Sequence, residues 1–212
     1  MYFSFYEIIL AAAFITGIIR YRALDPLLRK FVLLLGLTLF METIGWLTSV
    51  KHIRNLWIFN FFTCFEFLFY SYVFNRLLEN GRWVRVIKWA MLIYLILFLL
   101  NIFFIEGFER FHTITYRIGS VMVVLCCCLY LRQLMHTPSF EPVSRNPFFW
   151  TTTGLLFFYT GFFFYMSAAS ILLYTKLTID RIVWEAISGT LNIILYGSFI
   201  IAFLCQRIPK KK

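Results

Sequence analysis

Four polar side chains lie deep inside long apolar stretches of the sequence, and their types suit them to binding or proton transfer. Glu66 is the one charged residue of WIFNFFTCFEFLFYSYVF, which spans residues 57–74. A charged side chain at the centre of a membrane-spanning helix costs roughly 2.5–3.5 kcal/mol, so it persists when it is paired, protonated or facing a polar cavity. Glu42, Arg117 and Asn192 stand in comparable apolar surroundings. Such a group could bind a small polar or cationic molecule, or protons.

Each of these residues is expected to share a helix face with further polar residues, because side chains three or four positions apart lie on the same face. The predicted stripes are Thr38, Glu42, Gly45 and Ser49; Thr63, Glu66 and Tyr70; Thr113, Arg117 and Ser120; and Glu185, Ser188, Asn192 and Tyr196. Polar stripes on apolar helices belong in the interior of a bundle. We therefore predict one outward-opening ligand site, formed by Glu42, Glu66, Arg117, Asn192, Glu185, Asn60, Glu7 and Tyr70.

The charges of this predicted site do not balance. Its four glutamates, at positions 7, 42, 66 and 185, face the single arginine Arg117. A net charge of about −3 is not tolerated in a low dielectric, so some carboxyl groups must be protonated, a cation must enter, or loop cations must fold over the site. We expect Arg117 to pair with Glu66 or Glu42. In the alternative interpretation, the same buried contacts only fix the register of the helices and bind no ligand.

Membrane-spanning helices must position these residues. Hydrophobic residues make up 61% of the 212-residue chain and charged residues only 14%, whereas soluble domains are about 45–50% apolar. Runs long enough to cross a bilayer predict an all-α bundle of seven transmembrane helices in a single domain. The predicted spans are residues 2–19, 31–50, 56–78, 89–105, 111–134, 148–174 and 182–205.

The distribution of basic residues predicts the orientation of the bundle. Fourteen of the twenty Lys and Arg residues belong to the first, third and fifth predicted loops and to the C-terminal tail. Cytoplasmic loops are enriched in Lys and Arg, so the N-terminus is expected outside and the C-terminus in the cytoplasm. This asymmetry also explains the formal net charge of +10, so the partner that it indicates is the lipid bilayer and no nucleic acid is implied.

The third and seventh predicted spans share a weak internal similarity. Sliding one onto the other aligns Trp57 with Trp184, Thr63 with Thr190, Leu68 with Leu195, and Ser71 with Ser198. Helices one to three and five to seven could therefore form a parallel repeat joined by helix four. In so biased a composition the same matches could also arise by chance.

The sequence predicts no catalytic residue, no cofactor and no metal site. A zinc hydrolase needs several histidines close to a carboxylate, and the one arrangement available would join His52 and His112 to Glu185 at the outer rim. The seventh span has no lysine to hold retinal, and no serine adjoins a buried histidine. The five cysteines lack the spacing of metal ligands and are expected to be reduced and buried in the membrane.

The segment ETIGW, followed by NLWIFNFFTCFEFLFYSYVF, resembles uncharacterised small seven-helix bacterial membrane proteins that often lie beside sensor histidine kinase genes. The matching residues are Glu42, Gly45, Trp46, Asn55, Trp57, Asn60, Glu66 and Phe67. The resemblance covers the second and third spans. It implies a sensory role in the bacterial inner membrane. The chain carries no fused kinase, so a separate sensor kinase or another membrane partner would have to transmit the signal.

Several functions fit this pattern. The leading hypothesis is a non-enzymatic sensory module that binds an unidentified small polar or cationic ligand, or protons, and signals to a separate partner. A proton- or cation-coupled transporter could use the same carboxylates as a relay, although the inner halves of the spans lack a matching polar path. An intramembrane enzyme acting on lipid or quinone and a purely structural subunit remain further alternatives.

Overall fold

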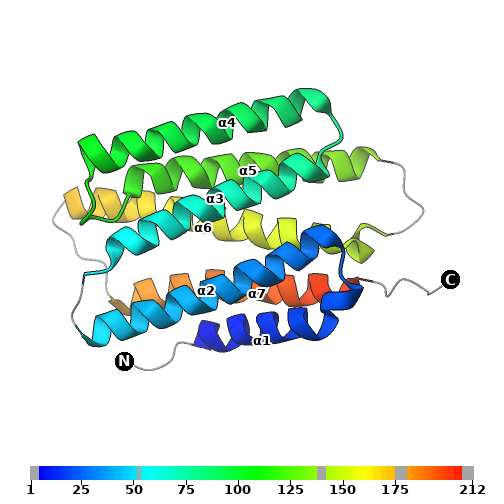
Figure 1. Ribbon diagram of the computed structural model, residues 1–212, viewed down its shortest axis with the longest axis horizontal. Coiled ribbons are helices and arrows are strands. Elements are labelled where there is room, and N and C mark those ends of the chain that lie inside the picture. Colours follow the sequence, from blue (N-terminus) through cyan, green and yellow to red (C-terminus); the bar gives the residue numbers. More distant parts are fainter. Residues whose placement is uncertain (1–4, 52–53, 138–141, 175–180, 207–212) are drawn as a thin grey trace. The chain divides into compact units, whose positions relative to one another are not determined.

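The computed structural model describes residues 5–51, 54–137, 142–174 and 181–206, and within them every regular element is helical (Figure 1). The α-helices are α1 (Phe5–Arg20), α2 (Pro26–Val50), α3 (Leu56–Leu77), α4 (Gly81–Leu100), α5 (Thr113–His136), α6 (Pro147–Tyr174) and α7 (Arg181–Cys205). Short 3-10 turns lie at Tyr21–Ala23 and Val143–Arg145, and the π-helical turn η2 (Asn101–Ile105) continues α4. The predicted all-α class is confirmed.

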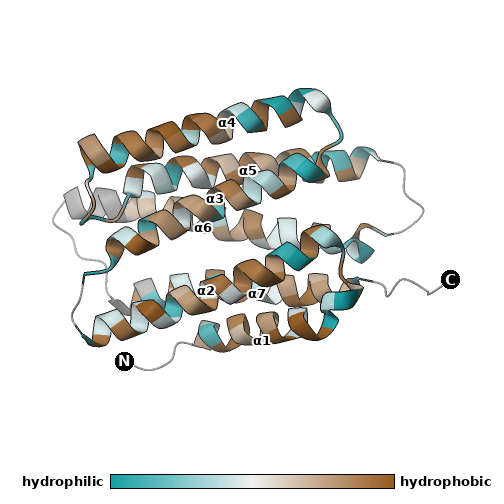
Figure 2. Ribbon diagram, in the orientation of Figure 1, coloured by the Kyte–Doolittle hydropathy of each residue, from teal (hydrophilic) through white to brown (hydrophobic). Residues whose placement is uncertain are grey.

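Two helices begin well before the apolar segments that they contain. α2 begins at Pro26 and α4 at Gly81, whereas their spans were predicted to begin at residues 31 and 89. Proline is favourable in the first turn of a helix because it has no N–H to leave unbonded. Asn80 caps α4 by accepting a hydrogen bond from the N–H of Arg82. Helices therefore begin at their capping signals and extend through polar turns; the teal first turns of α4 in Figure 2 illustrate this.

Five helices among the described residues are long and apolar enough to cross a membrane. They are α2, α3, α4 together with η2, α5, and the Glu185–Cys205 part of α7. α1 has 16 residues, which span about 24 Å against a hydrocarbon thickness of about 30 Å. The chain is thus a helical protein with several candidate membrane spans.

The chain divides into two compact units, and the boundaries fall inside α2 and near the end of α5. Unit 1 comprises residues 1–40 and 134–212, and unit 2 comprises residues 41–133. These units differ from the two halves that the proposed repeat would give, and the repeat and the single seven-helix domain stay predictions. Each unit is described by itself below.

Unit 1 packs α1 and α6 against α7. A Cβ atom at Gly17 of α1 would lie 2.7 Å from a methyl group of Val32 in α2, so glycine suits the close approach of α1 to the first part of α2. At the end of α7, the Arg20 guanidinium donates to the carbonyl of Gln206 at 2.7 Å. This bond satisfies one of the carbonyl groups that a helix leaves unbonded at its C-terminus.

Unit 2 is built around Phe67 of α3, which is fully buried. Its ring makes edge contacts with Tyr94 of α4 at 5.7 Å and with Tyr116 of α5 at 5.5 Å between centroids. Gly119 of α5 faces the same ring so closely that no Cβ atom would fit. The three helices therefore converge on one aromatic side chain, and the small residue on α5 makes room for it.

The two ends of unit 2 are named here after the amide side chain found at each. At the Gln133 end, α3 and α5 end and α4 begins. Gln133 donates to the carbonyl of Leu77 at 3.1 Å and accepts from the N–H of Glu79 at 3.0 Å, and Asn75 donates to the carbonyl of Val84 at 2.7 Å. At the Asn60 end, α3 and α5 begin and α4 ends.

Candidate functional site

The residues predicted to form one ligand site are distributed over both units. Glu42, Asn60, Glu66, Tyr70 and Arg117 belong to unit 2, and Glu7, Glu185 and Asn192 belong to unit 1. The convergence of all eight in a single site therefore stays a prediction. Within unit 2, the environment of each residue can be read directly.

Glu42 and Glu66 are half-buried and lie close enough for their charges to interact. Glu66 also acts electrostatically on Tyr116 of α5. Among the described residues, an ion pair joins Arg54 to Glu109, and none joins Arg117 to Glu66. The expected ion pair between Arg117 and Glu66 is therefore not seen. The charged neighbour of Glu66 is the side chain of Glu42.

Several members of the polar stripes are satisfied within their own helices. The hydroxyl groups of Thr38 and Ser120 donate to the carbonyls four residues earlier, at 3.0 and 2.8 Å. The Asn192 amide likewise donates to the carbonyl of Ser188 at 2.9 Å. Such bonds remove the cost of burying a polar group without any ligand. Glu185 is exposed, Glu7 is half-buried in the first turn of α1, and Tyr70 is buried.

A small polar cavity lies inside unit 2, at the Asn60 end. Its lining residues come from all three helices and from the connection before α5; they are Asn60, Thr63, Tyr94, Phe111, His112, Thr115 and Tyr116. The space open to the centre of a water-sized sphere is about 10 Å³, which is room for about one water molecule. Of the predicted site residues, Asn60 alone lines this cavity.

Asn60 fixes the connection that closes the cavity. Its side-chain amide donates to the carbonyl of Arg110 at 2.8 Å, and its side-chain oxygen accepts from the backbone N–H of His112 at 3.1 Å. Asn60 and His112 are each 3% exposed. Buried backbone groups need hydrogen-bond partners, so this single amide holds the last residues before α5 in place.

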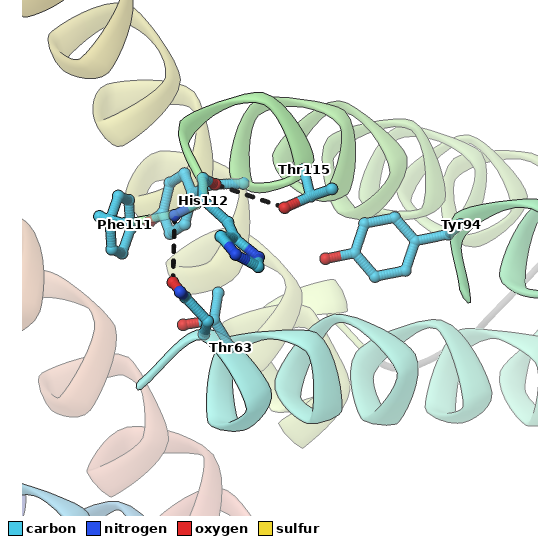
Figure 3. A pocket seen from close by; sticks show the side chains of 7 residues that line it. Thr63, Tyr94, Phe111, His112 and Thr115 are labelled. Atoms are coloured by element: carbon cyan, nitrogen blue, oxygen red, sulfur yellow. Dashed lines mark hydrogen bonds between the residues drawn. The ribbon is translucent and has the colours of Figure 1, made fainter. Parts of the chain in front are cut away.

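The His112 imidazole has one satisfied and one unsatisfied nitrogen. Nε2 lies 2.8 Å from the carbonyl oxygen of Gly107, which can only accept, so Nε2 carries the proton in this contact. In the neutral imidazole Nδ1 is then an acceptor, and it is buried without a hydrogen-bond partner among the described residues. Figure 3 shows the imidazole beside Thr63, with the hydroxyl end of Tyr94 pointing toward His112 and Thr115.

The hydroxyl groups around His112 have spare hydrogen-bonding capacity. Neither the Tyr94 phenol nor the Thr63 hydroxyl makes a hydrogen bond to another described residue. The Thr115 hydroxyl donates to the carbonyl of His112 at a long 3.4 Å and keeps its lone pairs. Buried polar groups are normally paired, so a buried Nδ1 without a partner among the described residues, beside hydroxyls with unused lone pairs, favours a ligand in this cavity.

The α4–α5 connection is held by residues that the sequence analysis did not include in the predicted site. Asn101 donates to one oxygen of Glu106 at 2.6 Å, and the other oxygen accepts from the N–H of Thr113 at 3.1 Å. Glu106 thereby caps the N-terminus of α5, where a negative charge is favourable. Gly107 adopts a φ of +72°, which glycine tolerates and which turns the chain toward His112.

Sequence reasoning missed most of the cavity for identifiable reasons. His112 follows the charged segment EGFER, which is typical of a solvent-exposed loop, and its burial depends on Asn60, 52 positions earlier. Tyr94 lies in an apolar run in which a tyrosine is usually a packing residue. The one usable signal was the combination of Asn60 and Thr63 on one helix face near the start of a span.

The donor set fits a polar ligand better than a metal ion. Within the described part of the chain, no three His, Cys, Asp or Glu side chains gather as metal ligands. The zinc arrangement considered from the sequence includes His52, which lies outside the described residues. The cavity instead offers one imidazole acceptor, three hydroxyls and aromatic rings, which can bind a small hydrogen-bond donor.

The chain was compared with protein families, curated proteins and solved structures. No protein-family model, curated protein or solved structure matches the chain.

Proposed function

We propose that the protein is a sensory membrane module whose unit 2 binds a very small polar or cationic solute at the Asn60 end. The observation that carries the proposal is that His112 lines a small polar cavity and that its buried Nδ1 has no hydrogen-bond partner among the described residues. A water-sized space limits the solute to a few atoms unless the connection before α5 moves. The proposal includes seven spans, an outside N-terminus and a location in the bacterial inner membrane.

The charge distribution of unit 2 supports binding from the outside. The exposed cations Arg76, Arg82, Arg85, Lys88 and Arg132 lie toward the Gln133 end, which the excess of Lys and Arg assigns to the cytoplasm. The cavity lies toward the opposite ends of the same helices. A solute that enters at the Asn60 end would therefore come from outside the cell.

The hydrogen bonds of the α4–α5 connection suggest how binding could be transmitted. Gly107 and Arg110 both contact cavity residues through their carbonyl groups, and Glu106 caps α5. A solute on Nδ1 of His112 would stabilise this arrangement and bias the positions of α4 and α5. The cytoplasmic ends of these helices would then present the signal to a separate sensor kinase or another membrane partner.

The proposal is tested by thermal unfolding of the full chain in lipid nanodiscs. The wild type and Tyr94→Phe are each measured with ammonium chloride, methylammonium chloride, glycine or choline chloride, at constant ionic strength. Tyr130→Phe is the matched control, because Tyr130 is also buried but contacts Phe74 toward the Gln133 end, in a tilted arrangement with 6.2 Å between ring centroids. At least one small solute should stabilise the wild type and the control, but not Tyr94→Phe. Identical responses of all three proteins would contradict the proposal.

A second candidate function is a proton- or cation-coupled transporter, and the proximity of Glu42 and Glu66 favours it. Glu42 and Glu66 lie in the candidate spans α2 and α3, where a carboxyl group persists when it is paired, protonated or facing a polar cavity. Proton uptake into proteoliposomes that is lost in Glu42→Gln and in Glu66→Gln would support this function. Uptake equal to that of empty vesicles would exclude it under those conditions.

A further inference from the structure

We propose that the solute bound beside His112 is the ammonium ion. This inference rests on the proposed function, because it names the ligand of the same site. Three properties of the cavity carry it: its size, the hydrogen-bonding character of its lining, and the absence of Lys and Arg from that lining.

Size limits the candidates first. The cavity holds about one water-sized molecule, and its walls include the rings of Phe111 and Tyr116. Asn60 is bonded on both sides to the connection that closes it, so the space does not widen without breaking buried hydrogen bonds. Ammonium is about as large as water, whereas an amino acid or a quaternary amine would have to displace this connection.

The lining selects a hydrogen-bond donor. Neutral His112 can only accept at Nδ1, because Nε2 donates to Gly107. The hydroxyls of Thr63, Tyr94 and Thr115 can all accept as well. Ammonium carries four N–H donors and no lone pair, so it can bond to the imidazole and to hydroxyls at once. A carboxylate or phosphate oxygen could not bond to Nδ1.

The lining places no positive charge against a bound cation. No Lys or Arg is among the lining residues. Arg117 follows Tyr116 in the sequence but does not line the cavity. Aromatic rings add attraction for a cation that is stripped of water.

Potassium has a similar size and the same charge, but it lacks hydrogen-bond donors. Hard cations prefer oxygen ligands, and an imidazole nitrogen is a poor partner for them. The comparison of ammonium with potassium therefore separates recognition of N–H donors from a general response to salt.

The test is a titration of the full chain in nanodiscs with ammonium chloride at neutral pH, with potassium chloride keeping the ionic strength constant. We expect a saturable rise in the unfolding temperature that potassium chloride alone does not produce. Tyr94→Phe and Thr63→Val should each weaken the apparent affinity by about tenfold or more, as expected for the loss of one hydrogen bond to a charged group. Tyr130→Phe should bind like the wild type, and methylammonium should bind more weakly because of its extra methyl group.

Direct observation of bound ¹⁵N-ammonium by NMR on the wild type keeps the inference testable if a variant does not fold. The inference would be overturned if potassium chloride raised the unfolding temperature as much as ammonium chloride does. It would also be overturned if Tyr94→Phe and Thr63→Val bound ammonium with unchanged affinity. If glycine or choline stabilises the protein through Tyr94 while ammonium does not, the ammonium assignment is wrong and the proposed function stands. If no solute acts through Tyr94, both are wrong and the cavity holds water only.

Discussion

Each end of unit 2 has one side-chain amide that bridges two parts of the chain. At the Gln133 end, Gln133 of α5 bonds to the backbone of the α3–α4 connection. At the Asn60 end, Asn60 of α3 bonds to the backbone of the α4–α5 connection. Both amides use their donor and their acceptor. The difference lies in the neighbours, because the Asn60 end also contains His112, Tyr94 and Thr63 with unused hydrogen-bonding groups. An amide bridge by itself joins helices, and the unused groups beside it are what distinguish a candidate binding site.

The largest expected effect comes from Asn60→Ala. The substitution leaves the N–H of His112 and the carbonyl of Arg110 without their partner, at a cost of about 1–3 kcal/mol for each group that stays buried. We expect a large drop in unfolding temperature and faster hydrogen exchange over residues 107–113. Unchanged exchange in this segment would show that Asn60 does not hold the connection.

Gln133→Ala should have a smaller effect. Gln133 is only half-buried and its partner Glu79 is exposed, so water can replace the lost bonds. The expected cost is about 0.5–1.5 kcal/mol for each bond. Thermal unfolding of the two alanine variants side by side measures the difference, and an equal or larger loss for Gln133→Ala would contradict the contrast between the ends.

Tyr94→Phe should leave the stability of the ligand-free protein nearly unchanged, within about 0.5 kcal/mol, because the phenol makes no hydrogen bond to another described residue. The ring and its contact with Phe67 remain. A comparison of unfolding temperatures without added solute checks this. A clear destabilisation would mean that the hydroxyl has a structural role.

A small effect that depends on salt is expected at the surface of the Asn60 end. Arg54 and Glu109 form an ion pair at 2.7 Å, but their side chains are 80% and 75% exposed. Exposed pairs contribute about 0–1 kcal/mol and are screened by salt. Arg54→Ala should therefore change the unfolding temperature slightly at low salt and not at all at high salt, whereas a salt-independent loss would indicate an additional contact.

The helices of this protein were predictable because each contains a long apolar run, and α3 and α7 follow the predicted spans within one residue at each end. The early starts of α2 and α4 were missed because a hydropathy pattern reports the apolar part of a helix and not its capped polar turns. Span 2–19 begins in residues that lie outside the described part of the chain.

The candidate site was predictable only in part. Glu42 and Glu66 were placed in one polar group from helical spacing, and in unit 2 their charges do interact. Asn60 was identified, but its partner His112 is buried through contacts between residues far apart in the sequence, for which no local pattern exists. Arg117 was expected to pair with Glu66 or Glu42 because of charge balance; the pair with Glu66 is not seen, and the pair with Glu42 stays a prediction.

The ¹⁵N chemical shift of His112 Nδ1 tests the central claim most directly, measured on ring-labelled protein in nanodiscs during titration with ammonium chloride against potassium chloride. If the cavity is a binding site for ammonium, the Nδ1 signal should shift and saturate as its lone pair accepts a hydrogen bond. The Nε2 signal should stay constant because its bond to Gly107 persists. An Nδ1 signal that does not change, or that changes equally with potassium, would contradict the account.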